Sequence, residues 1–375
     1  MTPARKRLSL TSAAIMTRTD ASHLAAGGLL GGHMGRMAFV AVLGMLPLAT
    51  PVSAAERHCQ LQAIGELTVS TSGPDVTTDG EINGQPVRLV VDTGADATIL
   101  FRDAAKRLGL KFRSLDNGMS YGIGGVTRLY SVRVKSLRVG SMEERDSDLV
   151  ATGHSDGATQ GAIGERFLTQ ADVEFDLPHG KIRFFRPQDC TGDQVVYWGD
   201  AYAVAPLAPT PYYQLLAQVS VNGRPVTAQL DTGAEVSVLT PQAAARAGVS
   251  RTAAGVERAG HMEGTGHEKI TAYVNVFDSF SFGEETIRHA KRWIADMFYA
   301  DVDDRSATSL IPKKAVDEPD MLLGADFFKS HRVYVSLQQR KIYVTYAGGA
   351  VFDTTAPPRG AQTVTEGANP VAGAN

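Results

Sequence analysis

Short runs of alternating apolar and polar residues make up most of the chain, and Gly, Asn or Pro separates them. Alternation with a period of two predicts half-buried strands, and an Asn-Gly pair between two such runs predicts a tight hairpin. Asn83-Gly84 and Asn222-Gly223 stand at such positions. Helical patterns are short: Asp103–Leu108 ends at Gly109, and a matching run follows Thr240-Pro241. The pattern therefore predicts a mostly β fold.

One segment with this pattern occurs twice, as Val90–Leu100 and as Gln229–Leu239. In both copies an apolar run enters Asp-Thr-Gly and a second apolar run follows, which predicts a strand, a turn that carries a carboxylate, and another strand. When Asp92 is aligned with Asp231, residues 82–110 match 221–249 without a gap, with 13 identities in 29 positions. The chain therefore contains an internal duplication.

A second match extends the duplication further along the chain. When Gly164 is aligned with Gly324, Ala162-Ile163-Gly164 meets Leu322-Leu323-Gly324, and Phe167 meets Phe327. Each copy thus pairs its Asp-Thr-Gly with a later hydrophobic-hydrophobic-Gly element. We expect two homologous β-barrel lobes, and equivalent turns would present one carboxylate from each lobe.

The repeat and the composition divide the chain into five parts. Residues 1–55 form a signal-peptide region and residues 56–185 the first lobe. The proline-containing stretch 186–205 is the expected linker and 206–350 the second lobe. Residues 351–375 contain Pro, Gly, Ala and Thr without an apolar period, so we expect a disordered tail.

The N-terminal region has the features of a signal peptide. Met37–Leu48 is an apolar run that is too short to span a bilayer. Arg36 precedes the run, and Val52-Ser53-Ala54 follows it as a small-x-Ala cleavage pattern. The sequence predicts export to a periplasm or to the outside of the cell, without stable membrane insertion.

Cys59 and Cys190 are the two cysteines of the chain, and they bracket the first lobe. In an oxidising compartment such a pair is expected to form a disulfide. The alternative is two free, buried thiols.

Composition excludes several other classes of function. The chain has 375 residues, 43% of them hydrophobic and 21% charged, with a formal net charge of −3, which is ordinary for a soluble globular protein and gives no reason to expect nucleic-acid binding. None of the nine histidines stands in a His-Glu-x-x-His spacing, so there is no zinc-peptidase motif. We expect neither a metal nor another cofactor.

Asp92 and Asp231 are the carboxylates that the two repeated turns would present. Two carboxylates within about 3 Å of one another cannot both ionise, so they share a proton. The ionised one can take a proton from water while the protonated one donates to a carbonyl oxygen, which suits amide hydrolysis without a metal. The predicted partner is a polypeptide substrate.

These residues resemble the pepsin and retropepsin group of aspartic peptidases, especially its retropepsin-like bacterial branch. The resemblance covers roughly residues 66–185 and 202–346. It rests on Asp92-Thr93-Gly94-Ala95 and Asp231-Thr232-Gly233-Ala234, and on the two later Gly elements. It implies acid-protease-like lobes with a cleft between them. Because one chain carries both halves, a monomer would suffice.

The resemblance implies a catalytic dyad of Asp92 and Asp231. Four neighbouring residues would support it, the threonines by hydrogen bonding across the lobes and the glycines by admitting substrate backbone: Thr93, Gly94, Thr232 and Gly233. In both turns the residue after Gly is Ala rather than the Ser or Thr usual in pepsin-like enzymes. We therefore expect a dyad pKa above that of pepsin and a mildly acidic optimum.

The resemblance also implies contacts with substrate. The glycine-rich hairpin Tyr121-Gly122-Ile123-Gly124 would be a flap over the cleft, with a counterpart near Met262–Gly266. Asp96 and Glu235 stand where retropepsin-like enzymes contact the substrate backbone; the alternative is that they are surface or structural carboxylates. Residues Glu165 and Ala325 replace the arginine of viral retropepsins, which argues against an ion pair of that kind.

The sequence also permits three other interpretations. Gly153–Gly157 fits the Gly-x-Ser-x-Gly serine-hydrolase motif, but no helical pattern follows it. A carboxylate pair also serves glycoside hydrolysis, although duplicated turns are not expected there. A catalytically inactive peptide-binding module of the same fold is the main alternative. We predict an aspartic endopeptidase.

Overall fold

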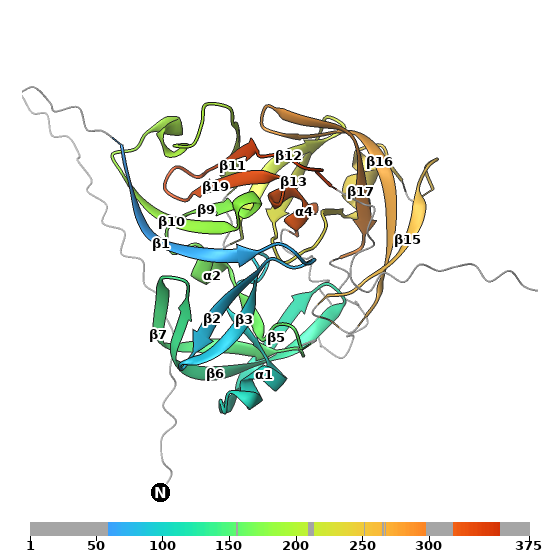
Figure 1. Ribbon diagram of the computed structural model, residues 1–375. Coiled ribbons are helices and arrows are strands. Elements are labelled where there is room, and N and C mark those ends of the chain that lie inside the picture. Colours follow the sequence, from blue (N-terminus) through green and yellow to red (C-terminus); the bar gives the residue numbers. More distant parts are fainter. Residues whose placement is uncertain are drawn as a thin grey trace, which may run out of the picture. The chain divides into compact units, whose positions relative to one another are not determined.

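The computed structural model describes residues 59–352, apart from 155–156, 209–213, 251, 265, 267 and 298–317. The described residues belong to one compact unit and are mostly strand (Figure 1), as predicted. The expected signal peptide, nearly all of the expected tail, and Ser155 of the serine-hydrolase motif lie outside the described residues. No helix in the described part is long and apolar enough to cross a membrane.

The first lobe contains seven strands and two short helices. In chain order they are β2 (Thr77–Ile82), β3 (Gln85–Val91), β4 (Ile99–Phe101), α1 (Arg102–Arg107), β5 (Phe112–Gly122), β6 (Gly125–Val139), β7 (Met142–Thr152), β8 (Gly161–Ile163) and α2 (Glu165–Leu168). Asn83 and Gly84 connect β2 to β3 with φ of 51° and 78°, the left-handed values of a tight hairpin turn. The hairpin and the helix α1 confirm the sequence pattern.

The second lobe repeats this order. Its elements are β12 (Leu216–Val221), β13 (Arg224–Leu230), β14 (Val238–Leu239), α3 (Pro241–Arg246), β15 (Glu257–Met262), β16 (Ile270–Phe282), β17 (Glu285–Ala295), β18 (Met321–Leu323) and α4 (Ala325–Phe328). Strand β3 pairs in parallel with β8, and β13 pairs in parallel with β18. Thr240 caps α3 by accepting a hydrogen bond from Ala243 N (3.2 Å). The duplication in the sequence is thus a duplication of topology.

A third sheet, which we call the inter-lobe sheet, joins the two lobes. It consists of β1 (Gln60–Ser70), β10 (Lys181–Gln188), β9 (Asp172–Asp176), β19 (His331–Ser336), β20 (Lys341–Tyr346) and β11 (Ala203–Ala208), each antiparallel to the next. The stretch 186–205, expected as a linker, overlaps β10 and β11 at its two ends. The short 3-10 helices η1 (Leu177–His179) and η2 (Gly192–Val195) flank β10.

The contact between the lobes in this sheet is symmetric. Val173 of β9 pairs with Val335 of β19, and Phe175 pairs with Val333. The sequence match that aligns Gly164 with Gly324 also aligns Val173 with Val333 and Phe175 with Val335, so the two pairings are equivalent. Local two-fold symmetry therefore relates the two halves of the chain.

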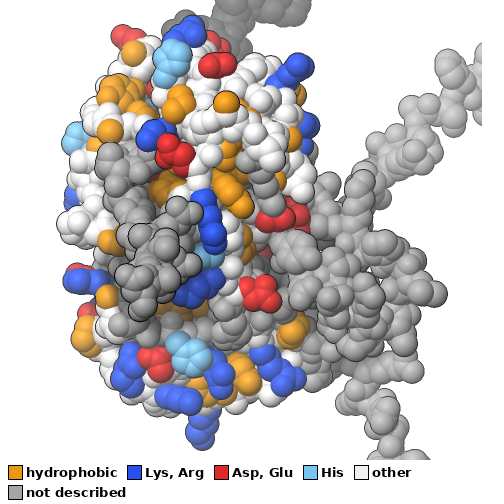
Figure 2. Space-filling view, turned by 90° about the vertical axis from the view of Figure 1, so that its right-hand side faces the viewer, with side chains coloured by type: hydrophobic (Ala, Val, Ile, Leu, Met, Phe, Trp, Pro, Cys, Tyr) orange, Lys and Arg blue, Asp and Glu red, His pale blue; other side chains and the backbone are white. Residues whose placement is uncertain are grey.

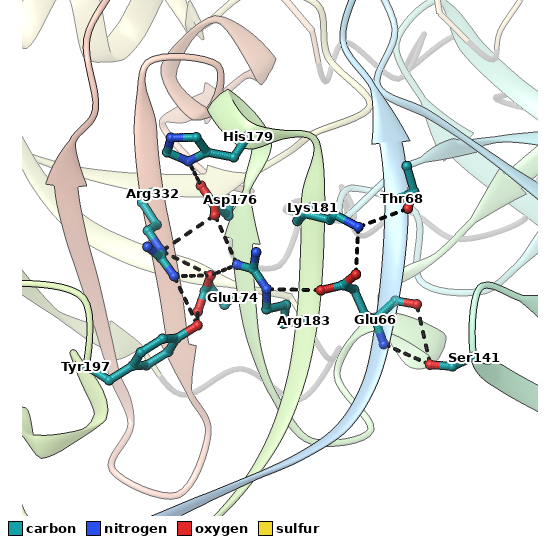
Figure 3. Close-up of polar contacts among 10 residues, drawn as sticks. All are labelled: Glu66, Thr68, Ser141, Glu174, Asp176, His179, Lys181, Arg183, Tyr197 and Arg332. Carbon is teal, nitrogen blue, oxygen red and sulfur yellow. Dashed lines mark hydrogen bonds and ion pairs between the residues drawn. The ribbon is translucent and has the colours of Figure 1, made fainter.

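Charged side chains on this sheet tie the two lobes and the connecting segment together (Figure 3). Glu174 of β9 is fully buried and accepts hydrogen bonds from Arg183 (2.6 Å), Arg332 (3.0 Å) and Tyr197 (2.6 Å). Arg183 also contacts Glu66 of β1 (3.1 Å). A buried carboxylate with several charged donors is compensated, and loss of a partner would be costly.

One apolar core continues through both lobes and the inter-lobe sheet. A disulfide joins Cys59 to Cys190, next to the pairing of β1 with β10. On the face shown in Figure 2, acidic, basic and apolar side chains are mixed, and Lys and Arg side chains gather toward its lower edge.

Candidate active site

Each Asp-Thr-Gly turn leaves a central strand and is closed by the later Gly element. Strand β3 ends at Val91, and Asp92 N donates to Ile163 O of β8 (3.0 Å). In the second lobe, Asp231 N donates to Leu323 O of β18 (2.9 Å). The two hydrophobic-hydrophobic-Gly elements found in the sequence thus hold the two turns in the same way.

Backbone amides hold one oxygen of each carboxylate. Asp92 Oδ1 accepts from Gly94 N (2.9 Å) and Ala95 N (3.1 Å). Asp231 Oδ1 accepts from Gly233 N (3.0 Å) and Ala234 N (3.1 Å). These amides fix Oδ1, the inner oxygen, of each carboxylate. The alanine after each Gly contributes its backbone amide to this contact, and no side-chain hydroxyl is needed there.

The two carboxyl groups face one another across the symmetry axis. A Cβ atom on Gly94 would lie 2.5 Å from Asp231 Cγ, and a Cβ on Gly233 would lie 2.3 Å from Asp92 Oδ1. The Asp92 and Asp231 side chains also hydrogen bond to each other. The close approach of the opposite carboxylate therefore requires glycine at both positions, and the predicted approach of substrate backbone to these glycines stays a prediction.

This surrounding raises the pKa of both carboxyl groups. Burial is the main cause for Asp92, and the amides of Gly94 and Ala95 oppose the rise. Burial and the charge of Asp92 together raise the pKa of Asp231 to about 8. Two like charges this close share one proton over the range between their two ionisations.

The threonines of the two turns form a cross-lobe bridge. Thr93 Oγ1 donates to Leu230 O (2.7 Å) and accepts from Thr232 N (2.9 Å). In return, Thr232 Oγ1 donates to Val91 O (2.7 Å) and accepts from Thr93 N (3.1 Å). Both side chains are buried. Four reciprocal hydrogen bonds thus join the two Asp-Thr-Gly turns. Each threonine also holds the last residue of the strand that precedes the opposite turn.

A family model described as aspartyl protease matches residues 78–167 and 217–327, more than half of the chain. The chain belongs to the aspartyl protease family. Each matched segment contains one Asp-Thr-Gly turn and one hydrophobic-hydrophobic-Gly element, so the family pattern occurs twice.

Two curated relatives match over short segments. DNA damage-inducible protein 1 of Phaeosphaeria nodorum is 37% identical over 82 residues, which is 19% of this chain and 18% of the relative. Protein DNA-DAMAGE INDUCIBLE 1 of Arabidopsis thaliana is 35% identical over 66 residues, 17% of this chain and 16% of the relative. Each match thus spans less than a fifth of the relative's length.

The predicted flap of this aspartyl protease is the hairpin of β5 and β6, with Ile123 and Gly124 at its tip. Ile123 O accepts from Gly266 N (2.9 Å), and Gly124 O accepts from Glu268 N (2.9 Å), so the tip lies on the loop between β15 and β16 of the second lobe. Ile123 packs against a second, smaller apolar cluster there, which includes Val236, Met262 and Trp293. The side chain of Tyr121 lies outside the described residues.

Asp96 and Glu235 lie in equivalent places after the two turns. Asp96 is exposed, and its charge interacts with Arg166. Glu235 is half-buried and interacts with Lys329, whose Nζ donates to Gly73 O (3.0 Å) in the first lobe. Both carboxylates thus have a basic neighbour on the chain itself.

A buried carboxyl, Glu165, lies behind the first turn, and nothing in the sequence around it indicated its burial. Glu165 is 3% exposed, and its N donates to Ala95 O (2.7 Å). Burial, with the charge of Asp96 adding to it, raises the pKa of Glu165 to about 9. This group is therefore neutral at pH 7. Within the described residues, no cluster of three or more His, Cys, Asp or Glu has the arrangement of a metal site.

Proposed function

We propose that the chain is an aspartic endopeptidase that hydrolyses peptide bonds with a water activated between Asp92 and Asp231. The observation that carries the proposal is the pair of carboxyl groups that face each other over Gly94 and Gly233 and hydrogen bond to each other. Family membership supports a protease type of function. The two lobes would bind an extended polypeptide between them.

The two carboxyl groups would divide the chemistry. Asp231 has 9% of its surface exposed, and its pKa is raised by burial and by the charge of Asp92, so it holds the shared proton. Asp92 is then the base that takes a proton from water. As the water oxygen bonds to the carbonyl carbon, Asp231 donates its proton to the carbonyl oxygen. The tetrahedral intermediate collapses when the C–N bond breaks. The leaving nitrogen takes the proton held by Asp92, and one hydroxyl of the intermediate returns a proton to Asp231 as the C=O bond re-forms.

The rigidity of the turns would contribute to the rate. The hydrogen bonds between Thr93 and Thr232 and the amides on each inner oxygen fix the two carboxyls before substrate arrives. Preorganised groups require no rearrangement as the transition state forms. The hairpin tip at Ile123–Gly124 would close over bound peptide, and Asp96 and Glu235 would accept hydrogen bonds from its backbone.

We further propose that the protein is exported and acts as a monomer. The disulfide between Cys59 and Cys190 supports an oxidising compartment, because such bonds persist there and are rare in the reducing cytosol. Both halves of the dyad come from one chain, which removes the need for a second copy.

The decisive experiment compares four forms of the chain from Glu56 onward: wild type, Asp92→Asn, Asp231→Asn and Asp79→Asn. Asp79 is an exposed partner of Arg88, so its variant controls for loss of a carboxylate. Each form is incubated with a mixed peptide library between about pH 3 and 8, a range that brackets the ordinary carboxyl pKa and the raised values of a dyad. The products are read by mass spectrometry.

We expect cleavage by wild type and Asp79→Asn, and none by the two dyad variants. Cleavage that survives Asp92→Asn or Asp231→Asn would refute the shared dyad. Retention of peptides by wild type without turnover would favour a peptide-binding module instead.

A further inference from the structure

The two lobes differ behind their equivalent catalytic turns. The alignment of Asp92 with Asp231 makes Thr98 equivalent to Ser237, and the alignment of Gly164 with Gly324 makes Arg166 equivalent to Asp326. The first of these pairs keeps a hydroxyl in both lobes. The second pair carries a basic residue in the first lobe and an acidic residue in the second.

In the second lobe, Ser237 and Asp326 belong to a short series of buried hydrogen bonds. Ser237 is fully buried, and its Oγ donates to Asp326 Oδ1 (2.6 Å) while its N donates to Asp326 Oδ2 (2.9 Å). Ser237 Oγ also accepts from Gly324 N (2.9 Å). Gly324 directly follows Leu323, whose carbonyl accepts from Asp231 N (2.9 Å). These hydrogen bonds thus connect Asp326 to the backbone that holds Asp231.

The contacts of Asp326 fit an ionised carboxylate. Ser237 Oγ, Ser237 N and Phe327 N all donate to it. The buried guanidinium of Arg292 on β17 supplies an opposite charge in the same lobe, and its interaction with Asp326 opposes the rise that burial causes in the pKa of that carboxyl. A carboxylate that accepts several hydrogen bonds makes strong, directional contacts.

The first lobe cannot form the same series of hydrogen bonds. Arg166 has donors and no acceptor on its side chain, so that side chain cannot accept a hydrogen bond from the Thr98 hydroxyl or from a backbone amide. The backbone of Arg166 does contact the outgoing limb of the turn, because its N donates to Asp96 O (3.4 Å). Only the second lobe therefore has a carboxylate at this position, Asp326, that can hold the residues after the Asp-Thr-Gly turn.

We propose that Asp326 is a positioning residue, which acts through Ser237 to hold the turn of Asp231 more rigidly than the turn of Asp92 is held. The inference rests on the proposed peptidase function for its catalytic consequence, but the rigidity itself does not depend on that function. In the proposed mechanism, the lobe with the carboxylate anchor supplies the acid of the dyad, and the first lobe supplies the base.

The first test measures rigidity without reference to catalysis. Amide hydrogen exchange is followed by mass spectrometry in wild type, Ser237→Ala, Ser237→Thr, Asp326→Asn and the first-lobe counterpart Thr98→Val. Asp326→Asn loses one of the two oxygens that accept from Ser237, so it should raise exchange in the second-lobe turn, as Ser237→Ala does. Removing the Ser237 hydroxyl leaves Gly324 N without its acceptor, so amides in residues 231–239 and 321–328 should exchange at least about tenfold faster in Ser237→Ala. Ser237→Thr keeps the hydroxyl and should restore protection. Thr98→Val should leave the second lobe unchanged.

The second test asks whether rigidity affects turnover. In steady-state cleavage of one library-derived peptide, Ser237→Ala and Asp326→Asn should lower kcat by about 10- to 100-fold with KM nearly unchanged, because misplacement of a catalytic group by a fraction of an ångström acts on the transition state. Ser237→Thr should recover most of kcat. Thr98→Val should lose much less than Ser237→Ala, which a general packing effect would not predict.

The outcomes separate this inference from the proposed function. Unchanged exchange in Ser237→Ala would overturn the anchor whether or not the protein is a peptidase. Faster exchange with unchanged kcat, or equal losses of kcat in Ser237→Ala and Thr98→Val, would overturn the positioning role. If wild type cleaves no peptide, the proposed function fails, and the exchange comparison still decides whether Asp326 holds the second turn.

Discussion

Gly233 offers a direct test of how closely the two carboxyl groups approach. A Cβ at this position would lie 2.3 Å from Asp92 Oδ1 and 2.4 Å from Asp92 Cγ, both far inside van der Waals contact. In Gly233→Ala the Asp92 carboxylate must therefore retreat by roughly 1 Å to reach ordinary contact. A displacement of that size in a catalytic group costs on the order of 100-fold in rate.

Stability should suffer less than activity in this variant. Inserting one methyl group into a packed site typically costs about 1–3 kcal/mol, and here the displaced group is a side chain rather than a strand. We expect Gly233→Ala to fold, to melt a few degrees below wild type, and to lose at least about 100-fold in kcat. Thermal unfolding and steady-state peptide cleavage on the same preparation would measure both quantities.

Gly73→Ala is the matched control. A Cβ on Gly73 would meet nothing within 4 Å, so this variant should keep wild-type melting and activity. The reasoning would be refuted if Gly233→Ala retained full activity, because the opposing carboxylate could not then lie where the structure has it. Equal losses in both variants would point to a general effect of alanine in turns instead.

Three further predictions concern stability. Thr93→Val removes the hydroxyl that bonds Leu230 O and Thr232 N, and should lower the free energy of unfolding by about 2–4 kcal/mol in urea titrations; wild-type stability would contradict the cross-lobe bridge. Burial raises the pKa of Glu165 to about 9, so the folded state binds the proton of this carboxyl more tightly than the unfolded state does. The free energy of unfolding should therefore fall as pH rises from about 4.5 toward 9, by up to about 1.4 kcal/mol per pH unit. Glu165→Gln should therefore melt higher than wild type at pH 8 and equally at pH 4, and parallel pH profiles would exclude a buried neutral carboxyl. Arg332→Met breaks a contact with buried Glu174 and should cost about 3–5 kcal/mol in the same titrations. Arg88→Met breaks an exposed pair and should leave the free energy of unfolding nearly unchanged; equal costs would mean that the inter-lobe sheet does not depend on the charge of Arg332.

The repeated elements of the site could be predicted because their signals are local. The turns at Asp92 and Asp231, the hairpin at Asn83-Gly84 and the capped helix α3 each depend on a few adjacent residues. Such features follow from backbone preferences that a sequence displays directly. The two later Gly elements were also recognisable as a repeat, and in the structure each of them lies against its turn.

Features that join distant segments could not be predicted in the same way. The pairing of β9 with β19 links strands from opposite halves of the chain and carries no turn signal. The prolines of the stretch 186–205 suggested a linker, yet strands β10 and β11 extend into it from both sides. Glu165 and Asp326 each follow a recognisable glycine element, but their burial and their partners depend on packing that periodicity does not report.

The symmetric pairing of β9 with β19 has a consequence for how this protein can change. In a dimer of identical halves, any substitution appears on both sides of the axis at once. Here the two halves are covalently joined, so position 166 can be basic while its counterpart at position 326 is acidic. The chain therefore keeps the geometry of a symmetric pair while each carboxyl of the dyad can be surrounded by residues suited to its own share of the reaction.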